Sequence, residues 1–215
     1  MLAYWSPQFS PSPKNRNVFW LAAAILNAKN ANAHLKAASP YLSPRADPIR
    51  WRSRNISRRL WWCCILCDRT MALNLRQNLQ ISSAQFDFYA TLPLGYMDLY
   101  YEIGQSRVYN VETKRHLVDI VGQMAELCSV LTKMIELIYL PNGTLASGGT
   151  RLEQGMTELA QCRVSMHDWY NCAASLYPDV LGNPNNEDQT ISPSRQTPHT
   201  GPIILYRSFL FMQYQ

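Results

Sequence analysis

The sequence of 215 residues lacks the short motifs by which many enzyme classes are recognised. It contains no serine elbow, no glycine-rich phosphate loop and no HExxH pair. Its four histidines are scattered along the chain, and the pair His167-Asp168 is a combination that more often faces solvent on a helix than takes part in catalysis. We therefore expect no catalytic residues and no enzyme activity, although a missing motif alone does not exclude an enzyme.

Long apolar runs and strand patterns are also missing. The stretch from Val18 to Leu26 follows Lys14 and Arg16 and loosely resembles a secretory signal. However, it is shorter than the about 20 residues that span a bilayer, and prolines precede it. We expect a core helix there and no membrane association. Because alternating strand patterns and internal repeats are absent, the predicted fold class is all-α.

Metal-ligand patterns are incomplete. Cys64 and Cys67 have the CxxC spacing of a zinc or redox site, but no second CxxC or CxxH lies nearby, and zinc needs about four ligands. Cys63 also belongs to the same apolar stretch. We expect buried free thiols in a reducing compartment, with no metal site, no cofactor and no disulfide scaffold.

Charge is sparse, at 16% of residues, which indicates that much surface is buried or that part of a larger protein is missing. Residues 45–69 hold seven arginines and two aspartates, and the remainder holds 13 basic and 13 acidic residues. The net charge of +5 is therefore one local patch. A protein that grips nucleic acid over its whole surface would distribute its charge more widely.

Arg50, Arg54 and Arg58 in this patch are spaced by four residues and form one basic stripe on a helix. The stripe could contact nucleic-acid phosphates or an acidic partner, or it could simply be a solvated face. Positive charge near a helix N-terminus costs about 0.3–1 kcal/mol per residue, which favours carboxylate partners within the chain or on another protein. We prefer such contacts to nucleic acid, because the patch is short and lacks a groove-reading motif.

The clearest predicted helix begins at Asp47-Pro48, an N-cap followed by proline at the first helical position. It is apolar nearly all round, so it belongs in the middle of a bundle. Its predicted buried stripe consists of Ile56, Leu60, Cys64, Cys67, Met71 and Leu75.

The other predicted helices complete a helical bundle over residues 1–180. The first covers about residues 17–36, and a short helix lies within residues 96–109. A long helix is capped by Asn110 and ends before Pro141, and a last helix starts at the capping box Thr150–Glu153 and stops before Pro178. Residues 78–95 are predicted to cross the surface, residues 181–202 to form a flexible polar linker, and residues 203–215 to start a further helix.

Charged residues flank the apolar centre of the helix that follows Asp47. Buried charges must be paired, so we expect Arg59, Asp68 and Arg69 to pair across to other helices in a structural ion-pair network. The available carboxylates are Glu102, Glu126 and Glu136.

This run resembles the signature of the fungal-specific transcription factor domain, the middle homology region of fungal zinc-cluster regulators, of the cutinase transcription factor type. The residues that carry the resemblance are Arg58, Arg59, Trp61, Trp62, Asp68 and Arg69. The segments Tyr4–Pro7, Phe19–Leu21 and Tyr109–Arg115 are similar to those that flank the signature. Asn74 and Asn78 stand where the family usually has a Gly-Arg-Pro-like turn. None of the cysteines has the spacing of the family's zinc cluster.

The resemblance implies an incomplete, non-enzymatic regulatory domain of a nuclear transcription regulator, truncated at both ends and without the zinc cluster. Its implied partners are transcription machinery or regulatory proteins, a second copy of the chain or a small-molecule effector. The implied targets are metabolic or biosynthetic genes, and no sequence-specific DNA binding is expected from this chain alone. The alternative is a small-molecule-binding helical protein or enzyme unrelated to transcription, with residues 96–109 and the methionine-rich helices lining an apolar pocket.

Overall fold

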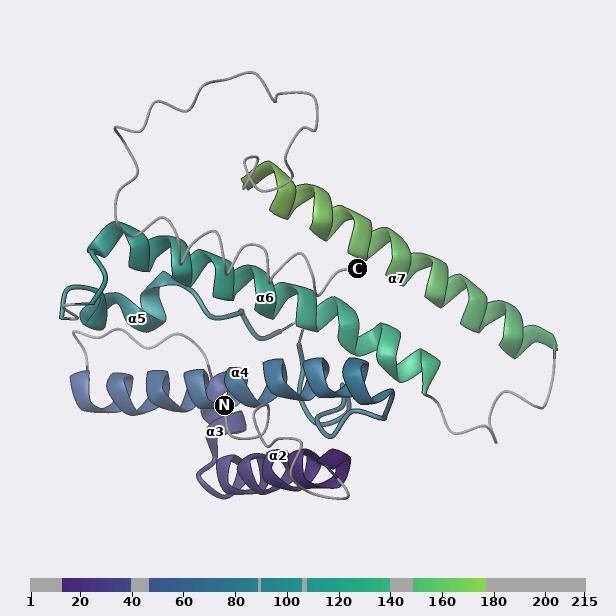
Figure 1. Cartoon of the computed structure of the whole chain (residues 1–215), viewed down its shortest axis with the longest axis horizontal. Helices are drawn as coiled ribbons and strands as arrows, with labels where there is room; N and C mark the ends of the chain where they lie inside the picture. Colours follow the sequence, from purple (N-terminus) through teal and green to yellow (C-terminus); the bar gives the residue numbers. More distant parts are fainter. Residues whose placement is uncertain (1–12, 40–46, 89, 106–107, 140–148, 177–215) are drawn as a thin grey trace.

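The computed structural model describes residues 13–39, 47–88, 90–105, 108–139 and 149–176. Every regular element in these ranges is a helix, which confirms the all-α prediction (Figure 1). The helices are α2 (Pro13–Asn30), α3 (Ala33–Ala38), α4 (Pro48–Leu75), α5 (Tyr96–Ile103), α6 (Val111–Ile138) and α7 (Gly149–Leu176).

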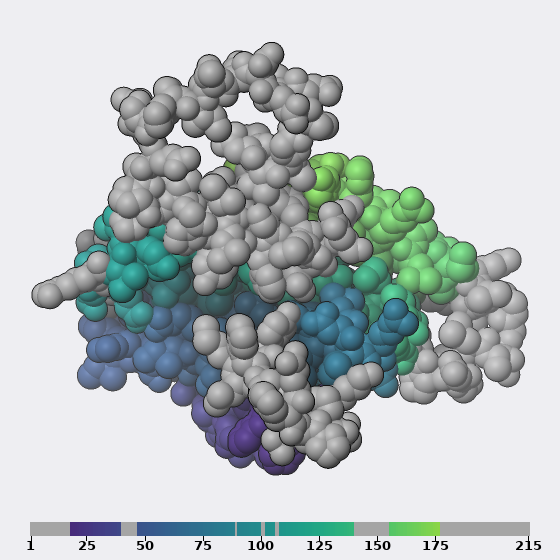
Figure 2. All heavy atoms as spheres, in the orientation of Figure 1, coloured from purple at the N-terminus to yellow at the C-terminus, as the bar shows by residue number. Residues whose placement is uncertain are grey.

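Helix α4 lies in the middle of the fold, as predicted for a helix with apolar residues nearly all round. Helices α2 and α3 pack on one side of α4, and α6 packs on the other (Figure 1). Helix α6 lies between α4 and α7, while α5 contacts both α4 and α6. In Figure 2, α2 and α7 occupy opposite edges of the molecule, with α4 and α6 between them.

The starts of the two central helices follow their predicted caps. The Asp47 carboxylate accepts a hydrogen bond from the backbone N–H of Arg50 at 3.0 Å, and Pro48 is the first residue of α4. The Asn110 side chain accepts the backbone N–H of Thr113 at 2.7 Å at the start of α6. These bonds satisfy amide groups that the first turn of a helix cannot pair internally.

The prediction of one unbroken helix over residues 17–36 is wrong. The chain forms α2 and α3, separated by a turn in which Asn32 adopts the left-handed conformation with φ 54°. Asparagine enters this conformation more readily than most residues, so the helix is interrupted without glycine or proline.

The predicted buried stripe of α4 is also wrong in part. Ile56 is 50% exposed and Leu60 is 44% exposed, and Cys67 is exposed as well. The buried face of α4 instead combines the two tryptophans with charged side chains, and it includes Trp61, Trp62, Ile65, Arg58, Asp68 and Arg69. Charged groups replace apolar ones at the core because they are paired there, as described below.

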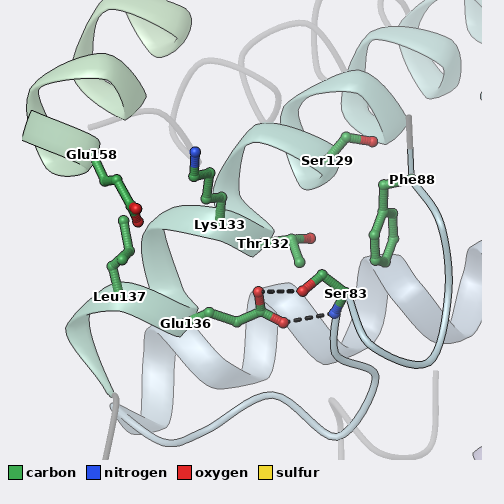
Figure 3. Close-up of a pocket in the computed structure, with 8 residues that line it drawn as sticks. All are labelled: Ser83, Phe88, Ser129, Thr132, Lys133, Glu136, Leu137 and Glu158. Carbon is green, nitrogen blue, oxygen red and sulfur yellow. Dashed lines mark hydrogen bonds between the residues drawn. The ribbon is translucent and has the colours of Figure 1, made fainter. Parts of the chain in front are cut away.

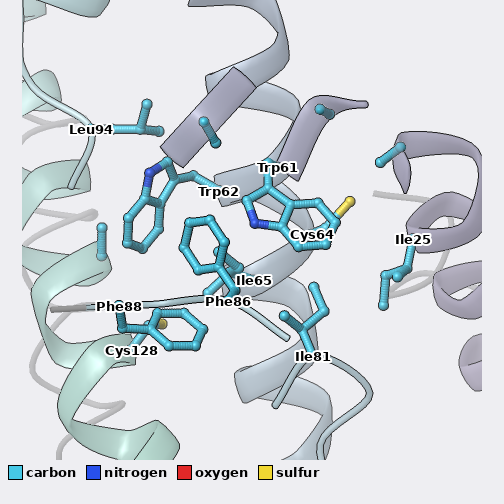
Figure 4. Close-up of a cluster of buried hydrophobic side chains, with 14 of the residues drawn as sticks. Ile25, Trp61, Trp62, Cys64, Ile65, Ile81, Phe86, Phe88, Leu94 and Cys128 are labelled. Atoms are coloured by element: carbon cyan, nitrogen blue, oxygen red, sulfur yellow. The ribbon is translucent and has the colours of Figure 1, made fainter. Parts of the chain in front are cut away.

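The segment between α4 and α5, predicted to cross the surface, enters the core. Ile81, Phe86, Phe88 and Leu94 are all buried. Figure 4 shows the rings of Phe86 and Phe88 beside the two tryptophans of α4. The ring centroids of Phe86 and Phe88 are 5.0 Å apart, and those of Trp61 and Phe86 are 5.7 Å apart, both in edge-on arrangements. The core therefore contains four packed aromatic side chains. Two of them, Phe86 and Phe88, belong to a segment that was predicted to cross the surface.

A second buried cluster joins α6 and α7. Its members are Ala72, Ile120, Leu127, Leu131, Ile135, Trp169 and Ala173. The indole N–H of Trp169 donates to the backbone carbonyl of Gln123 at 3.1 Å, which fixes α7 on α6. The predictions for residues 181–202 and 203–215, and for the side chains of the Thr150–Glu153 capping box, lie outside the described residues.

Candidate functional site

Asp68 and Arg69 form a buried ion pair at the centre of the molecule, and each side chain is only 1% exposed. The Arg69 guanidinium donates to the Asp68 carboxylate at 2.7 Å. It also donates through Nε and Nη2 to the Thr132 hydroxyl of α6, at 3.0 and 2.8 Å. For Asp68 and Arg69, the prediction of ion pairs across to other helices is therefore wrong, since the two neighbours pair directly and α6 supplies a hydroxyl instead of a glutamate.

Asp68 also holds the segment that follows α4. Its two carboxylate oxygens accept the backbone N–H groups of Gln80 and Ile81, at 3.1 and 3.0 Å. Burial raises the pKa of the Asp68 carboxyl, while Arg69 and these two amides act in the opposite direction. These hydrogen bonds offset the desolvation of the Asp68 carboxylate. They also fix the start of the backbone segment that carries Phe86 and Phe88 into the core.

The Arg69 guanidinium also packs against an aromatic ring. Its guanidinium carbon lies 4.8 Å from the centroid of the Phe88 ring, which is a cation–π distance. Burial lowers the pKa of the Arg69 guanidinium, and the adjacent Asp68 carboxylate opposes this effect. One arginine thereby links α4, α6 and the segment between α4 and α5.

Arg58 has the same linking role at the other end of α4. Its Nε donates to the Asp98 carboxylate of α5 at 2.8 Å, and its Nη1 donates to the carbonyl of Ala37 in α3 at 2.9 Å. Its Nη2 donates to the carbonyls of Leu92 and Pro93, at 3.0 and 3.2 Å. Asp98 was not among the predicted partners, although an acidic residue in the first turn of a helix is a recognisable pattern.

Arg59 forms a two-pronged ion pair with Glu102 of α5, at 2.6 and 2.9 Å, which confirms one of the predicted partners. The hydrogen bonds from Arg59 lower the pKa of the Glu102 carboxyl. The pair is partly solvent-exposed, in contrast to Asp68 and Arg69. Glu126 and Glu136, the other predicted partners, bond to Gln123 and to Ser83.

The predicted basic stripe is not one exposed surface. Arg50 is exposed, but Arg54 and Arg58 are only 8% and 5% exposed. Arg54 donates to the Ser39 carbonyl at 2.7 Å, and Arg58 is held by Asp98. A joint contact of all three arginines with a partner is thus contradicted, and the alternative of carboxylate contacts within the chain holds for Arg58.

A cavity of about 330 Å³ lies between α6, α7 and the segment before α5 (Figure 3). Its lining includes Thr132, the residue that bonds Arg69. Ser83 donates its backbone N–H and its hydroxyl to Glu136, at 2.6 and 2.7 Å, and so closes one side. The remaining lining residues are Phe88, Ser129, Lys133, Leu137 and Glu158. This mixture of charged, hydroxyl and apolar groups could hold a small polar ligand.

The cysteines and histidines do not form a reactive centre in the described part of the chain. Burial raises the pKa of Cys64 to about 11 and that of Cys128 to about 12, so these thiols are not thiolates at neutral pH. All six cysteines are free, but Cys63, Cys67 and Cys172 are exposed, so the expectation of burial is wrong for these three. His167 and Asp168 are both exposed on α7, as the sequence suggests.

Among the described residues, no group of three or more histidine, cysteine or acidic side chains is arranged to hold a metal ion. None of the described helices has both the length and the apolar character needed to cross a bilayer.

The chain is similar to fungal transcription factors. It is 20% identical over its whole length to a transcription factor of Fusarium pseudograminearum, and 24% identical over 65% and 82% of its length to cutinase transcription factors 1 beta and 1 alpha of Fusarium vanettenii. These matches span only 24%, 16% and 18% of the respective relatives. No family model matches the chain, and no solved structure matches it.

The sequence matches include both cutinase transcription factors, the type to which the resemblance of residues 58–69 pointed. In the all-α structure, four charged residues of this run form ion pairs within the chain, namely Arg58, Arg59, Asp68 and Arg69. The homologues of this chain are thus fungal transcription factors, and the resemblance predicted from its sequence is confirmed.

Proposed function

We propose that the chain is a helical regulatory domain of a fungal transcription regulator, which does not itself contact DNA and acts through other proteins or a small-molecule effector. The observation that carries the proposal is the similarity to fungal transcription factors over 65–100% of the chain. The relatives are not enzymes, which favours regulation over catalysis.

The burial and internal pairing of the arginines support the proposal that the chain does not itself contact DNA. Specific DNA binding depends on several exposed basic groups that neutralise phosphates. Arg54, Arg58 and Arg69 are buried and hydrogen-bonded within the chain, and Arg59 is paired with Glu102. The remaining exposed arginines of α4, Arg50 and Arg52, are too few for a strong phosphate-binding surface.

The wider setting of the proposal follows from the relatives. We place the domain in the nucleus, as part of a regulator of metabolic or biosynthetic genes. Its partners would be transcription machinery, regulatory proteins or a second copy of the chain. The cavity above Thr132 is one place at which an effector could act on the packing of α4 against α6.

A tethering experiment tests the regulatory role. The 215-residue chain is fused to an unrelated DNA-binding domain and expressed in a fungal host with a matching reporter gene. Reporter output should differ from that of the DNA-binding domain alone at equal nuclear protein level. Equal output for the two proteins, across several carbon and nitrogen sources, would contradict a regulatory role.

An electrophoretic shift experiment tests the absence of DNA contact. The chain alone is titrated against a pool of random duplexes at physiological salt. We expect only weak, salt-sensitive retardation without sequence enrichment, because Arg54, Arg58 and Arg69 are buried and not available to phosphates. Enrichment of one sequence with tight binding would refute the proposal that the chain leaves DNA recognition to another region.

A further inference from the structure

Helix α4 has one long face that the other described helices leave open. Helices α2 and α3 pack on one side of α4, and α6 packs on the other (Figure 1). Along the open face, Ile49 is 84% exposed, Ile56 is 50% exposed and Leu60 is 44% exposed. Cys63 and Cys67 are exposed on the same face. Apolar side chains gathered on one exposed surface indicate a place where another molecule binds.

The spacing of this face is that of a coiled-coil contact line. Its exposed positions follow one another at alternating steps of four and three residues, and they are Ile49, Ser53, Ile56, Leu60, Cys63 and Cys67. Such steps repeat on average every 3.5 residues, which keeps the side chains in line with a second helix. From its first to its last residue the line measures about 27 Å. We call these six residues the α4 seam.

The α4 seam is uncharged. Partial desolvation of the sulfur atoms raises the pKa of the Cys63 and Cys67 thiols, so both are neutral at neutral pH. Neutral thiols behave as small apolar side chains. Apart from the hydroxyl of Ser53, the seam therefore offers a partner only apolar contacts.

The residues that border the α4 seam carry an excess of positive charge. Arg52 and Arg59 lie along one edge and Arg50 along the other, at the positions that flank the contact line in a coiled coil. Glu102 binds Arg59 directly and also attracts Arg52, while Asp47 caps the start of the helix. Arg50 and Arg52 form no salt bridge of their own among the described residues. Carboxylates on a partner would complement these two cations.

Two other occupants fit this border poorly. A second copy of α4 in a parallel pair would place the two basic halves side by side, and in an antiparallel pair Arg59 would face its own counterpart. Like charges across a helix pair are unfavourable. The apolar segment 203–215 contains one arginine and no aspartate or glutamate, so it has no carboxylate side chains to offer. The border therefore favours an acidic helix from another protein.

We propose that the α4 seam docks an amphipathic helix of another protein, with apolar side chains along its contact line and carboxylates at its borders. The apolar line would pack against Ile56 and Leu60, and the carboxylates would pair with Arg50 and Arg52. Docking would bury the apolar positions of α4 that are exposed in the chain by itself. The inference rests on the proposed function only in assigning the docked helix to a regulatory partner.

Two designed peptides test the chemistry of the partner. Both repeat one heptad over about 21 residues with leucine at the contact positions, and they carry either glutamate or lysine at the flanking positions. In fluorescence anisotropy with the 215-residue chain, we expect saturable binding of the glutamate peptide and at least about 10-fold weaker binding of the lysine peptide. Added salt should reduce this preference. Equal affinity for both peptides, or no saturation by the glutamate peptide at about 100 μM, would overturn the proposal.

Substitutions locate the binding on α4. Leu60→Glu places a charge in the middle of the α4 seam and should weaken binding of the glutamate peptide about 10-fold or more. Leu26→Glu changes a leucine that is 60% exposed on α2, and this matched control should bind normally. Arg52→Glu should shift the preference toward the lysine peptide, a gain that an unfolded variant could not show. An equal loss with Leu60→Glu and Leu26→Glu would refute the site.

The thiols of the α4 seam give a direct readout of the docked helix. Bound glutamate peptide should slow the reaction of Cys63 and Cys67 with a maleimide reagent, because it covers both sulfur atoms. Cys172 is exposed on α7 and is the internal control, whose labelling should not change. Peptide mapping by mass spectrometry measures all three rates. Protection of Cys172 to the same degree, or no protection of Cys63 and Cys67, would contradict docking at the seam.

Sedimentation of the chain alone tests the second copy as the occupant. We expect a monomer at micromolar concentration for the unaltered chain and for Leu60→Glu. A dimer that Leu60→Glu dissociates would assign the α4 seam to self-association and would overturn the proposal of another protein.

The reporter assay separates docking from the proposed function. Leu60→Glu should change the output of the tethered chain, and Leu26→Glu should not. Peptide binding at the α4 seam with no effect of Leu60→Glu on output would overturn the regulatory role of the seam. A tethered chain that alters output but binds no glutamate peptide would overturn the docking site and leave the proposed function intact.

Discussion

Asp68 is the residue through which the centre of α4 holds the segment that follows this helix. Its carboxylate accepts hydrogen bonds from the Arg69 side chain and from two backbone amides of the next segment, all inside the core. A buried carboxylate is stable only with such a complete set of donors. The Asp-Arg pair therefore has a packing role that apolar residues of similar size could not reproduce at the backbone of Gln80 and Ile81.

Replacing Asp68 tests this role. Asp68→Asn leaves Arg69 buried without its counter-charge, and we expect the free energy of unfolding to fall by about 3–5 kcal/mol. Removing both charges while an acceptor is kept for the backbone amides, in Asp68→Asn with Arg69→Met, should cost less than the single change because no charge is stranded. Urea unfolding of the 215-residue chain measures both. A cost below about 1 kcal/mol for Asp68→Asn would contradict this account.

The exposed ion pair between Arg59 and Glu102 should show its contribution in the pH dependence of stability. Arg59 lowers the pKa of Glu102 below its ordinary value of 4.5 in the folded chain. The stabilisation is therefore present above the unfolded-state pKa and is lost as the pH falls through the lower folded-state pKa.

We expect Glu102→Gln to reduce stability at neutral pH by about 0.2–1 kcal/mol, as is usual for an exposed pair. The difference from the unaltered chain should vanish in strong acid. Thermal melts from neutral to acidic pH, with Asp168→Asn as the control, measure it. A difference that persists in strong acid would mean that the effect is not electrostatic.

At the scale of helices, the sequence predicts best where a backbone requirement is met by one recognisable side chain. Asp47 and Asn110 cap α4 and α6 as predicted because a short acceptor side chain before a helix has few other uses. The break at Asn32 is missed, since the left-handed turn there uses no glycine or proline. Prediction of the α4 face fails at Ile56 and Leu60, because apolar periodicity cannot register that charged residues occupy the core.

The end of α4 gives a prediction at the same scale. Arg76 caps the helix in the left-handed conformation, with φ 52°. This conformation costs a residue with a Cβ atom about 1–2 kcal/mol, while glycine adds about 0.5–1 kcal/mol of entropy to the unfolded chain. Arg76→Gly should therefore increase the free energy of unfolding by up to about 1 kcal/mol. Arg76→Ala keeps the Cβ atom, so an equal gain with alanine would show that the backbone conformation is not the cause.

At the scale of the whole molecule, the bundle depends on segments that are distant in the sequence. The helix content could be predicted, and Glu102 could be named as one of three candidate partners, because helical periods and opposite charges are local or simple patterns. The partners of Arg58 and Arg69 could not be predicted. Asp98 comes close to Arg58 only after α5 has packed on α4, and Thr132 comes close to Arg69 only after α6 has packed there. The burial of Phe86 and Phe88 was missed for the same reason.

The accessibility of the cysteine thiols provides a test of this packing. Cys63, Cys67 and Cys172 are exposed, whereas Cys64, Cys128 and Cys162 are buried. In the folded chain we expect a maleimide reagent to label the three exposed thiols, and the other three only after denaturant is added. Mass spectrometry with peptide mapping counts and locates the labels. Rapid labelling of Cys128 in buffer would show that α4 and α6 separate readily.

The buried ion pair also has a consequence for the order in which the chain folds. Asp68 reaches amides 12 and 13 residues away, whereas Arg69 reaches a hydroxyl 63 residues away. Closing the longer loop costs about 1.4 kcal/mol more free energy, because more chain entropy is lost. The Asp68 contacts should therefore form first, and α6 should dock later. In stopped-flow experiments, Asp68→Asn should mainly slow folding, and Thr132→Val should mainly accelerate unfolding. Two adjacent residues would then belong to an early and a late step of the same folding reaction.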